Sequence, residues 1–133
     1  MLAGGFIFLA DLARAFSRPV TIDFARGASY GNGKQSSGVT SWSLEPRDLR
    51  GRHVLIVEDI VDTGTTLHAL RSRLLAQRPA WLRTVCLLDK PSRRRCEVPI
   101  EFVGFTIDDV FVVGYGLDHA ENYRHLPYIA AAP

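Results

Sequence analysis

The stretch that decides the fold is VLIVEDIVDTGTT, residues 54–66. Its first residues belong to an apolar run at residues 53–57, HVLIV. Such a run is typical of a strand buried on both faces of a parallel sheet. Three carboxylates follow in a predicted loop, at Glu58, Asp59 and Asp62. A small turn rich in hydroxyl groups then leads into a helix. A strand, a loop and a helix in immediate succession are typical of α/β proteins.

The segments around this stretch continue the same pattern. The helix after the turn places Leu67, Leu70 and Leu74 on one face. Strands alternating with helices predict an α/β fold, with a mostly parallel sheet flanked by helices, in a single domain of residues 1–133. The predicted elements are helices at 6–16 and 66–77 and strands at 20–25, 53–57, 82–88, 100–105, 111–113 and 128–131.

A long loop is predicted between two of these strands, at residues 27–43. Its sequence, GASYGNGKQSSGVTSWS, is rich in glycine and serine and shows no periodicity. Loops of this length inside compact domains are uncommon and are often lids over a functional site. We therefore expect this loop to act as a lid.

Composition narrows the functional classes. No stretch approaches the roughly 20 apolar residues that cross a bilayer, and Asp11 interrupts the first apolar run, which argues against a signal peptide. A net charge of +2 is too small to indicate nucleic-acid binding. The histidines form no ligand pattern, and the two cysteines suit a reducing cytoplasm. We expect no membrane or nucleic-acid partner and a cytoplasmic location.

The acidic turn has the chemistry of a phosphate and sugar site. Ligands of open α/β sheets bind outside the carboxyl ends of the strands, and a helix N-terminus binds phosphate through its free amides. Gly64 lets the backbone approach an anion closely. Glu58 and Asp59 are acceptors for sugar hydroxyls or for a hard cation such as magnesium. The alternative is an acidic cap that only starts a helix. Hydroxyl donors come from Thr63, Thr65 and Thr66.

This turn resembles the phosphoribosyl pyrophosphate motif of the type I phosphoribosyltransferases, and further segments resemble their hypoxanthine-guanine branch. The resemblance covers nearly all of the 133 residues. The segments are a first pyrophosphate loop (Leu2-Ala3-Gly4-Gly5), a lid (Ser29-Tyr30-Gly31 and Gln35-Ser36-Ser37-Gly38), a base-recognition strand end (Leu88-Asp89-Lys90-Pro91) and a purine and pyrophosphate tail (residues 111–118 with Tyr123-Arg124).

The resemblance implies roles around the sugar and the pyrophosphate. Asp62 is the implied general base, which takes a proton from the imidazole ring of the purine. Glu58 and Asp59 are implied to bind the ribose hydroxyls, and Asp118 to hold magnesium near the diphosphate. Arg124 is an implied pyrophosphate contact. The implied magnesium ligands are Glu58, Asp59 and Asp118. The alternative for Asp62 is an interaction with the helix dipole alone. Without the resemblance, Asp118 and Arg124 would be interpreted as a surface ion pair.

Further residues are implied to bind the base and the rest of the substrate. Lys90 would donate to the 6-oxo group of a purine, Phe111 would stack on its face, and the backbone of Val112 would meet its edge. The alternatives are that Lys90 is a solvated lysine at a strand end and that Phe111 and Val112 are core residues. The implied contacts to phosphate, pyrophosphate and lid are Ala3, Gly4, Ser29, Tyr30, Thr63, Gly64, Thr65 and Thr66.

Two departures from the family stand at the start of the chain. Ala3 replaces a lysine that many relatives carry in the first pyrophosphate loop. Relatives also have a helical segment and a buried strand before that loop, and Met1 stands where the strand would end. The resemblance therefore implies an N-terminally incomplete domain that lacks its first core strand. We expect such a chain to be marginally stable when alone.

The predicted activity is transfer of phosphoribosyl to hypoxanthine or guanine, as in purine salvage. Two alternatives remain open: a xanthine-preferring phosphoribosyltransferase, and a catalytically weak relative that binds nucleotides for regulation. The expected partners are small-molecule substrates and further copies of the chain, in a homodimer or homotetramer. The run Arg93-Arg94-Arg95 is predicted to be a solvated turn rather than a nucleic-acid patch.

Overall fold

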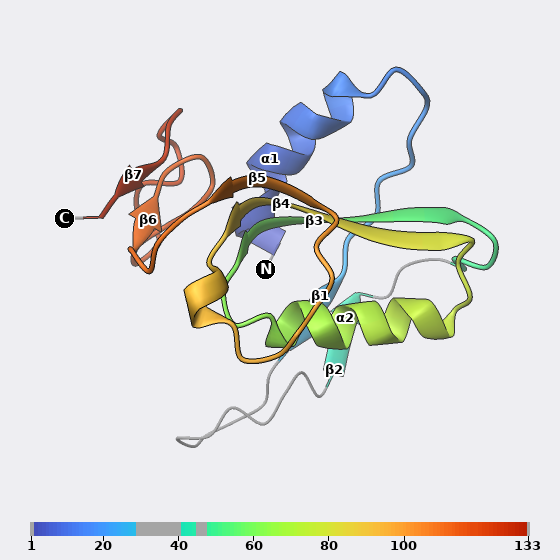
Figure 1. The fold of residues 1–133 in the computed structure, drawn as a ribbon. Coiled ribbons are helices and arrows are strands. Elements are labelled where there is room, and N and C mark those ends of the chain that lie inside the picture. The colour runs from blue at the N-terminus through green and yellow to red at the C-terminus, as the bar shows by residue number, and fades with distance from the viewer. Residues whose placement is uncertain (1, 29–40, 45–47, 133) are drawn as a thin grey trace.

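The computed structural model describes residues 2–28, 41–44 and 48–132. A parallel sheet in the order β3-β4-β5 lies at its centre, formed by β3 (His53–Val61), β4 (Trp81–Asp89) and β5 (Phe102–Thr106). Helices α1 (Leu2–Ala15) and α2 (Thr65–Ala76) lie on opposite faces of this sheet (Figure 1). The predicted parallel-sheet α/β architecture is confirmed.

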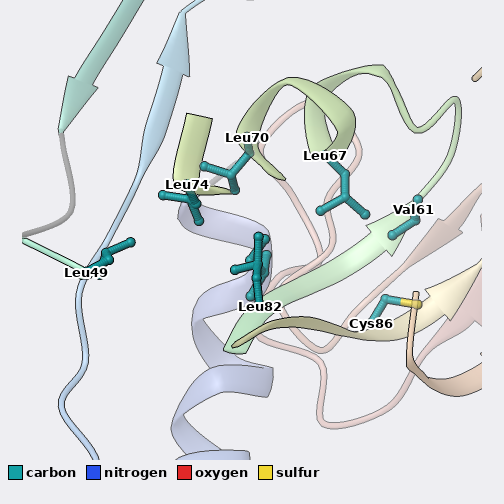
Figure 2. Close-up of a cluster of buried hydrophobic side chains, with 8 residues drawn as sticks. Leu49, Val61, Leu67, Leu70, Leu74, Leu82 and Cys86 are labelled. Carbon is teal, nitrogen blue, oxygen red and sulfur yellow. The ribbon is translucent and has the colours of Figure 1, made fainter. Parts of the chain in front are cut away.

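The core lies between α2 and the sheet (Figure 2). The three leucines predicted to share one helical face, Leu67, Leu70 and Leu74, are all buried in it. Because these side chains recur every three or four residues, they point together onto β3 and β4. The other buried members are Leu49, Ile56, Val61, Leu82 and Cys86.

Strand β3 is longer than predicted. The acidic loop was expected to begin at Glu58, but the pairing with β4 continues through Glu58↔Cys86 to Val61↔Asp89. The prediction is wrong because Ile60 and Val61 supply further apolar side chains, so the ladder continues past the first two carboxylates. Glu58 and Asp59 are therefore strand residues, and the loop is reduced to residues 62–64.

Helix α1 begins earlier than predicted. The first pyrophosphate loop was expected at residues 2–5, but these residues form the start of the helix. Glycine has low helix propensity, so packing rather than propensity extends α1. A Cβ on Gly4 would lie 1.7 Å from Oδ2 of Asp59, and one on Gly5 would lie 3.7 Å from the Asp59 nitrogen. The two glycines let the start of α1 approach β3 closely.

The strand predicted at residues 20–25 does not form. The side chains of Val20, Ile22 and Phe24 alternate as expected, but all three are exposed. Among the described residues, β3 is an edge strand of the sheet, and the segment 20–25 does not pair with it. An apolar groove of about 550 Å³ lies there, bounded also by Phe6 and Leu9 of α1. The alternation predicted an extended chain correctly, but a strand also needs a hydrogen-bonded neighbour.

The remaining strands form two small antiparallel pairs. β1 (Arg26–Ala28) pairs with β2 (Ser41–Leu44), which joins the two ends of the loop predicted at 27–43. Ser29 and Tyr30 of the predicted lid lie outside the described residues. β6 (Val112–Val113) pairs with β7 (Ala130–Ala131), and both are shorter than predicted. Within the described part of the chain, no helix has the length and apolar character needed to cross a bilayer.

A buried arginine connects α2 to the sheet. Nη1 of Arg71 donates to Oγ1 of Thr84 at 2.6 Å, and the guanidinium also pairs with both carboxylate oxygens of Glu101 at 3.2 Å. The Thr84 nitrogen donates to Oε2 of Glu101 at 2.6 Å. Every partner in this network is satisfied, which offsets the cost of burying a charge.

We predict that Arg71→Met lowers the free energy of unfolding by about 2 kcal/mol, because it removes the charged donor from the buried hydroxyl of Thr84 and from the exposed carboxylate of Glu101. Urea denaturation with Arg50→Met as the control measures this, since Arg50 is an exposed arginine. Equal unfolding midpoints for the two variants would show that the Arg71 network does not stabilise the fold.

Candidate functional site

Three strand ends meet at one edge of the sheet. β3, β4 and β5 are parallel, so their carboxyl ends lie side by side (Figure 1). Asp62 follows β3, Lys90 follows β4, and Asp108 and Asp109 follow β5. The main-chain nitrogen of Ile107 donates to the oxygen of Asp89 at 2.9 Å, which ties the last two ends together. The candidate site residues at this edge are Asp62, Lys90 and Asp109.

The turn between β3 and α2 requires a glycine. Gly64 has a φ of +82°, in the left-handed region, and a Cβ there would meet Cδ of Arg94 at 3.0 Å and the oxygen of Cys96 at 3.2 Å. No side chain caps the first amides of α2, while Oγ1 of Thr63 lies 2.7 Å from Oγ1 of Thr65. Uncapped amides beside exposed hydroxyl groups are suited to binding an anion.

The segment after β4 holds this turn in place. The nitrogen of Lys90 donates to the oxygen of Val61 at 3.0 Å, and the nitrogen of Arg95 donates to the oxygen of Thr63 at 2.9 Å. Nη1 of Arg94 donates to the main-chain oxygen of Asp62 at 3.0 Å. Nη2 of the same guanidinium pairs with the carboxylate of Asp89. We name residues 89–96 the clamp segment. Its contacts orient the turn independently of the charges that the turn presents.

Asp62 and Lys90 belong to one group of charges. Nε of Arg93 donates to Oδ1 of Asp62 at 3.1 Å, and Nη1 of Arg93 lies 3.5 Å from Oδ2 of Asp109. Oδ1 of Asp109 lies 3.9 Å from Nζ of Lys90. Lys90 is buried, with 7% of its surface exposed, whereas Asp62 and Asp109 are partly open to solvent.

Glu58 and Asp59 are adjacent strand residues, so their side chains point to opposite faces of β3. Burial raises the pKa of Glu58 to about 7, and the negative charge of Asp59 acts in the same direction. Burial also raises the pKa of Asp59, against the opposing effects of its hydrogen bond with Ile60 and of the Arg124 charge. Asp59 lies against Gly4 at the start of α1.

The C-terminal segment reaches the same end of α1. Gly116 has a φ of +97°, and a Cβ there would lie 2.4 Å from the oxygen of Gly4. Nη2 of Arg124 pairs with Oδ1 of Asp118 at 2.7 Å, and Nη1 donates to the oxygen of Gly116 at 2.7 Å. The ring of Phe111 is exposed and lies edge-on to His119, with centroids 5.2 Å apart.

The predicted magnesium ligands do not form a complete coordination site on their own. Glu58 and Asp59 face opposite ways, and both oxygens of Asp118 are engaged, by Arg124 and by the nitrogen of Glu121. Among the described residues, no three His, Cys, Asp or Glu side chains group closely enough to hold a metal ion. This donor set fits magnesium that arrives on a phosphate ligand and takes one or two carboxylates from the protein.

The structure therefore brings the predicted residues to one edge in two groups. Asp62, Lys90 and the turn at 62–66 form the first, and Gly4, Asp59 and the C-terminal ion pair form the second. Ser29 and Tyr30, and the side chain of Ala3, lie outside what the structure describes. Sequence reasoning missed Arg93, Arg94 and Asp109 as site residues. The solvated turn predicted at 93–95 is wrong for Arg94, which the ion pair with Asp89 draws inward.

Comparisons with known proteins agree on one family. Residues 1–120 match the family model of the phosphoribosyl transferase domain. The chain is 50% identical over 130 residues to the hypoxanthine phosphoribosyltransferase of Salmonella typhimurium, covering 97% of this chain and 73% of that relative. It is 45% identical to the hypoxanthine-guanine phosphoribosyltransferase of Aquifex aeolicus, with the same shares covered.

Solved structures give the same result. A hypoxanthine-guanine phosphoribosyltransferase from Bacillus anthracis superimposes with a TM-score of 0.91 at 44% identity, over 99% of this chain and 78% of that one. A ternary substrates complex of the Trypanosoma cruzi hypoxanthine phosphoribosyltransferase also gives 0.91, at 46% identity, over 98% and 72% of the two chains.

We predict that Glu58 makes stability depend on pH. Its pKa of about 7 in the folded protein lies above the ordinary value of 4.5, so between these values the folded state keeps a proton that the unfolded state has lost. Stability should therefore fall as pH rises through this window, by about 3 kcal/mol. In Glu58→Gln that loss should be absent.

Urea denaturation from pH 4 to pH 8 measures this difference, and Glu97→Gln, at an exposed glutamate, is the matched control. Parallel stability curves for the wild type and Glu58→Gln would contradict the raised pKa.

Proposed function

The chain belongs to the phosphoribosyltransferase family, in its hypoxanthine-guanine branch, and on that premise we propose that the carboxyl edge of its sheet is the active site. The enzyme transfers the phosphoribosyl group from phosphoribosyl pyrophosphate to a 6-oxopurine base and releases pyrophosphate. The observation that carries the proposed site is the position of Asp62 and Lys90 at the ends of neighbouring strands, joined by the Lys90–Val61 main-chain hydrogen bond of 3.0 Å.

The base is proposed to lie between the ends of β3 and β4. Lys90 has a buried stem and donates from its ammonium to the 6-oxo group, a contact that the amino group of adenine would not accept. The exposed ring of Phe111 stacks on the purine face, and the backbone of Val112 meets its edge. Asp62 then accepts the proton that leaves the imidazole ring as the new bond forms.

The 5′-phosphate is proposed to bind at the N-terminus of α2. The uncapped amides there and the positive end of the helix dipole favour an anion. Gly64 allows the close approach, and the clamp segment keeps the turn open. Hydroxyl groups of the same turn add donors: Thr63, Thr65 and Thr66.

The ribose and pyrophosphate are proposed to lie toward the start of α1. Glu58 and Asp59 accept from the ribose hydroxyls or approach the metal, while the backbone at Ala3 and Gly4, with Arg124, binds pyrophosphate. Magnesium is the proposed cofactor, and when bound it supplies charge neutralisation for the departing pyrophosphate. The carboxylates that would hold it are Glu58, Asp59 and Asp118.

The reacting sugar carbon becomes cation-like as pyrophosphate leaves, so its charge and its access to water both need control. Carboxylates held beside the sugar stabilise developing positive charge. The lid carrying Ser29 and Tyr30 is proposed, from the family resemblance, to close over this centre and exclude water.

Self-association and location are also proposed. β5, at the edge of the described sheet, exposes Phe102, Val103 and Phe105, and such a patch is suited to a contact between copies of the chain in a homodimer or homotetramer. The two cysteines are both free, which suits a reducing cytoplasm.

We predict that Asp62→Asn lowers the turnover number by about a hundredfold or more and changes the KM for phosphoribosyl pyrophosphate little, because it removes the proton acceptor and keeps the shape of the turn. Steady-state assays with hypoxanthine, guanine, xanthine and adenine measure this. Asp48→Asn is the control, since Asp48 is an exposed carboxylate outside the site. An unchanged turnover number in Asp62→Asn would remove Asp62 from the mechanism.

A further inference from the structure

Lys90 is a buried cation whose position depends on a counter-charge. Only 7% of its surface is exposed, and a buried ammonium needs an anionic or hydrogen-bonding partner to offset its lost hydration. Its neighbour Asp89 is already paired with Arg94. Among the described residues, the carboxylate within ion-pair distance of Nζ belongs to Asp109, at 3.9 Å. Asp109 is therefore the described counter-charge of Lys90.

Asp109 is itself restrained from two directions. Its second oxygen lies 3.5 Å from Nη1 of Arg93, whose Nε donates to Asp62 at 3.1 Å. Main-chain hydrogen bonds on either side of Asp109, from Ile107 to Asp89 and from Val110 to Asp108, fix the loop that carries it. Two cations and two carboxylates thus form one network of balanced charge across the three strand ends.

We propose that Asp109 is a positioning residue that sets base specificity, by holding the ammonium of Lys90 where a 6-oxo group is bound, without touching the base itself. At 3.9 Å the ammonium and the carboxylate form an ion pair without a hydrogen bond, so the N–H donors of the ammonium remain for the ligand. A lysine stem has many rotamers, and an unrestrained ammonium would distinguish an oxo from an amino group less well. This inference rests on the proposed role of Lys90 in binding the base.

The test is a kinetic comparison of Asp109→Asn with Asp108→Asn in the full chain. Both variants remove one negative charge from the same loop, but the described contact of Asp108 is a main-chain one to Val110. Asp109→Asn should raise the KM for hypoxanthine by about fivefold, the upper range for a partly exposed ion pair, and leave the KM for phosphoribosyl pyrophosphate within about twofold. Asp108→Asn should match the wild type, and Asp109→Glu should recover most of the loss.

A double-mutant cycle with Lys90→Gln separates this inference from the proposed function. If Lys90→Gln leaves the KM for hypoxanthine unchanged, the proposed base contact is wrong, and the inference fails with it. If Lys90→Gln raises that KM and Asp109→Asn acts like Asp108→Asn, the base contact stands and the role of Asp109 is overturned. The inference predicts that Asp109→Asn has no further effect on the KM for hypoxanthine once Lys90 is replaced.

Discussion

The main-chain hydrogen bonds between the clamp segment and the turn after β3 are the constraint on which the rest of the site depends. They join Lys90 to Val61 and Arg95 to Thr63, and the side chain of Arg94 adds a bond to the oxygen of Asp62. Backbone groups carry most of this attachment, so the side chains of Asp62 and Lys90 do not hold the turn and form the separate charge network with Arg93 and Asp109. At Gly64 the φ of +82° favours glycine, and Arg94 and Cys96 of the clamp segment would crowd a Cβ there at 3.0 and 3.2 Å.

Parallel pairing extends this local constraint to the whole of the proposed active site. Because β3, β4 and β5 end at one edge, the proposed proton acceptor Asp62, the proposed base-binding Lys90 and its counter-charge Asp109 come from three different strand ends and still belong to one network. α1 adds the second half of the site, since its glycines allow Asp59 and the C-terminal turn at Gly116 to approach its first residues. Phosphoribosyl transfer needs both halves, because the base attacks from one side of the sugar and pyrophosphate leaves from the other.

Much of the fold could be predicted because it follows from local periodicity. The leucine face of α2 and the apolar strands β3 and β4 are properties of short segments. The extra length of β3 and the absent strand at residues 20–25 depend on whether a neighbouring strand offers hydrogen bonds, which no local pattern reveals. Arg93 and Asp109 were missed for a similar reason: they lie 31 residues or more beyond Asp62 in sequence, and only the parallel topology brings them together.

The central claim, that the turn after β3 binds the phosphoribosyl substrate at the carboxyl edge, is tested most directly by amide hydrogen exchange with and without magnesium and phosphoribosyl pyrophosphate. The account predicts slower exchange at the amides of Thr63, Gly64, Thr65 and Thr66, whose N–H groups would donate to phosphate. The amides of His53 and Trp81, at the amino ends of β3 and β4, should exchange at unchanged rates. Equal exchange in the turn with and without the substrate would contradict the account.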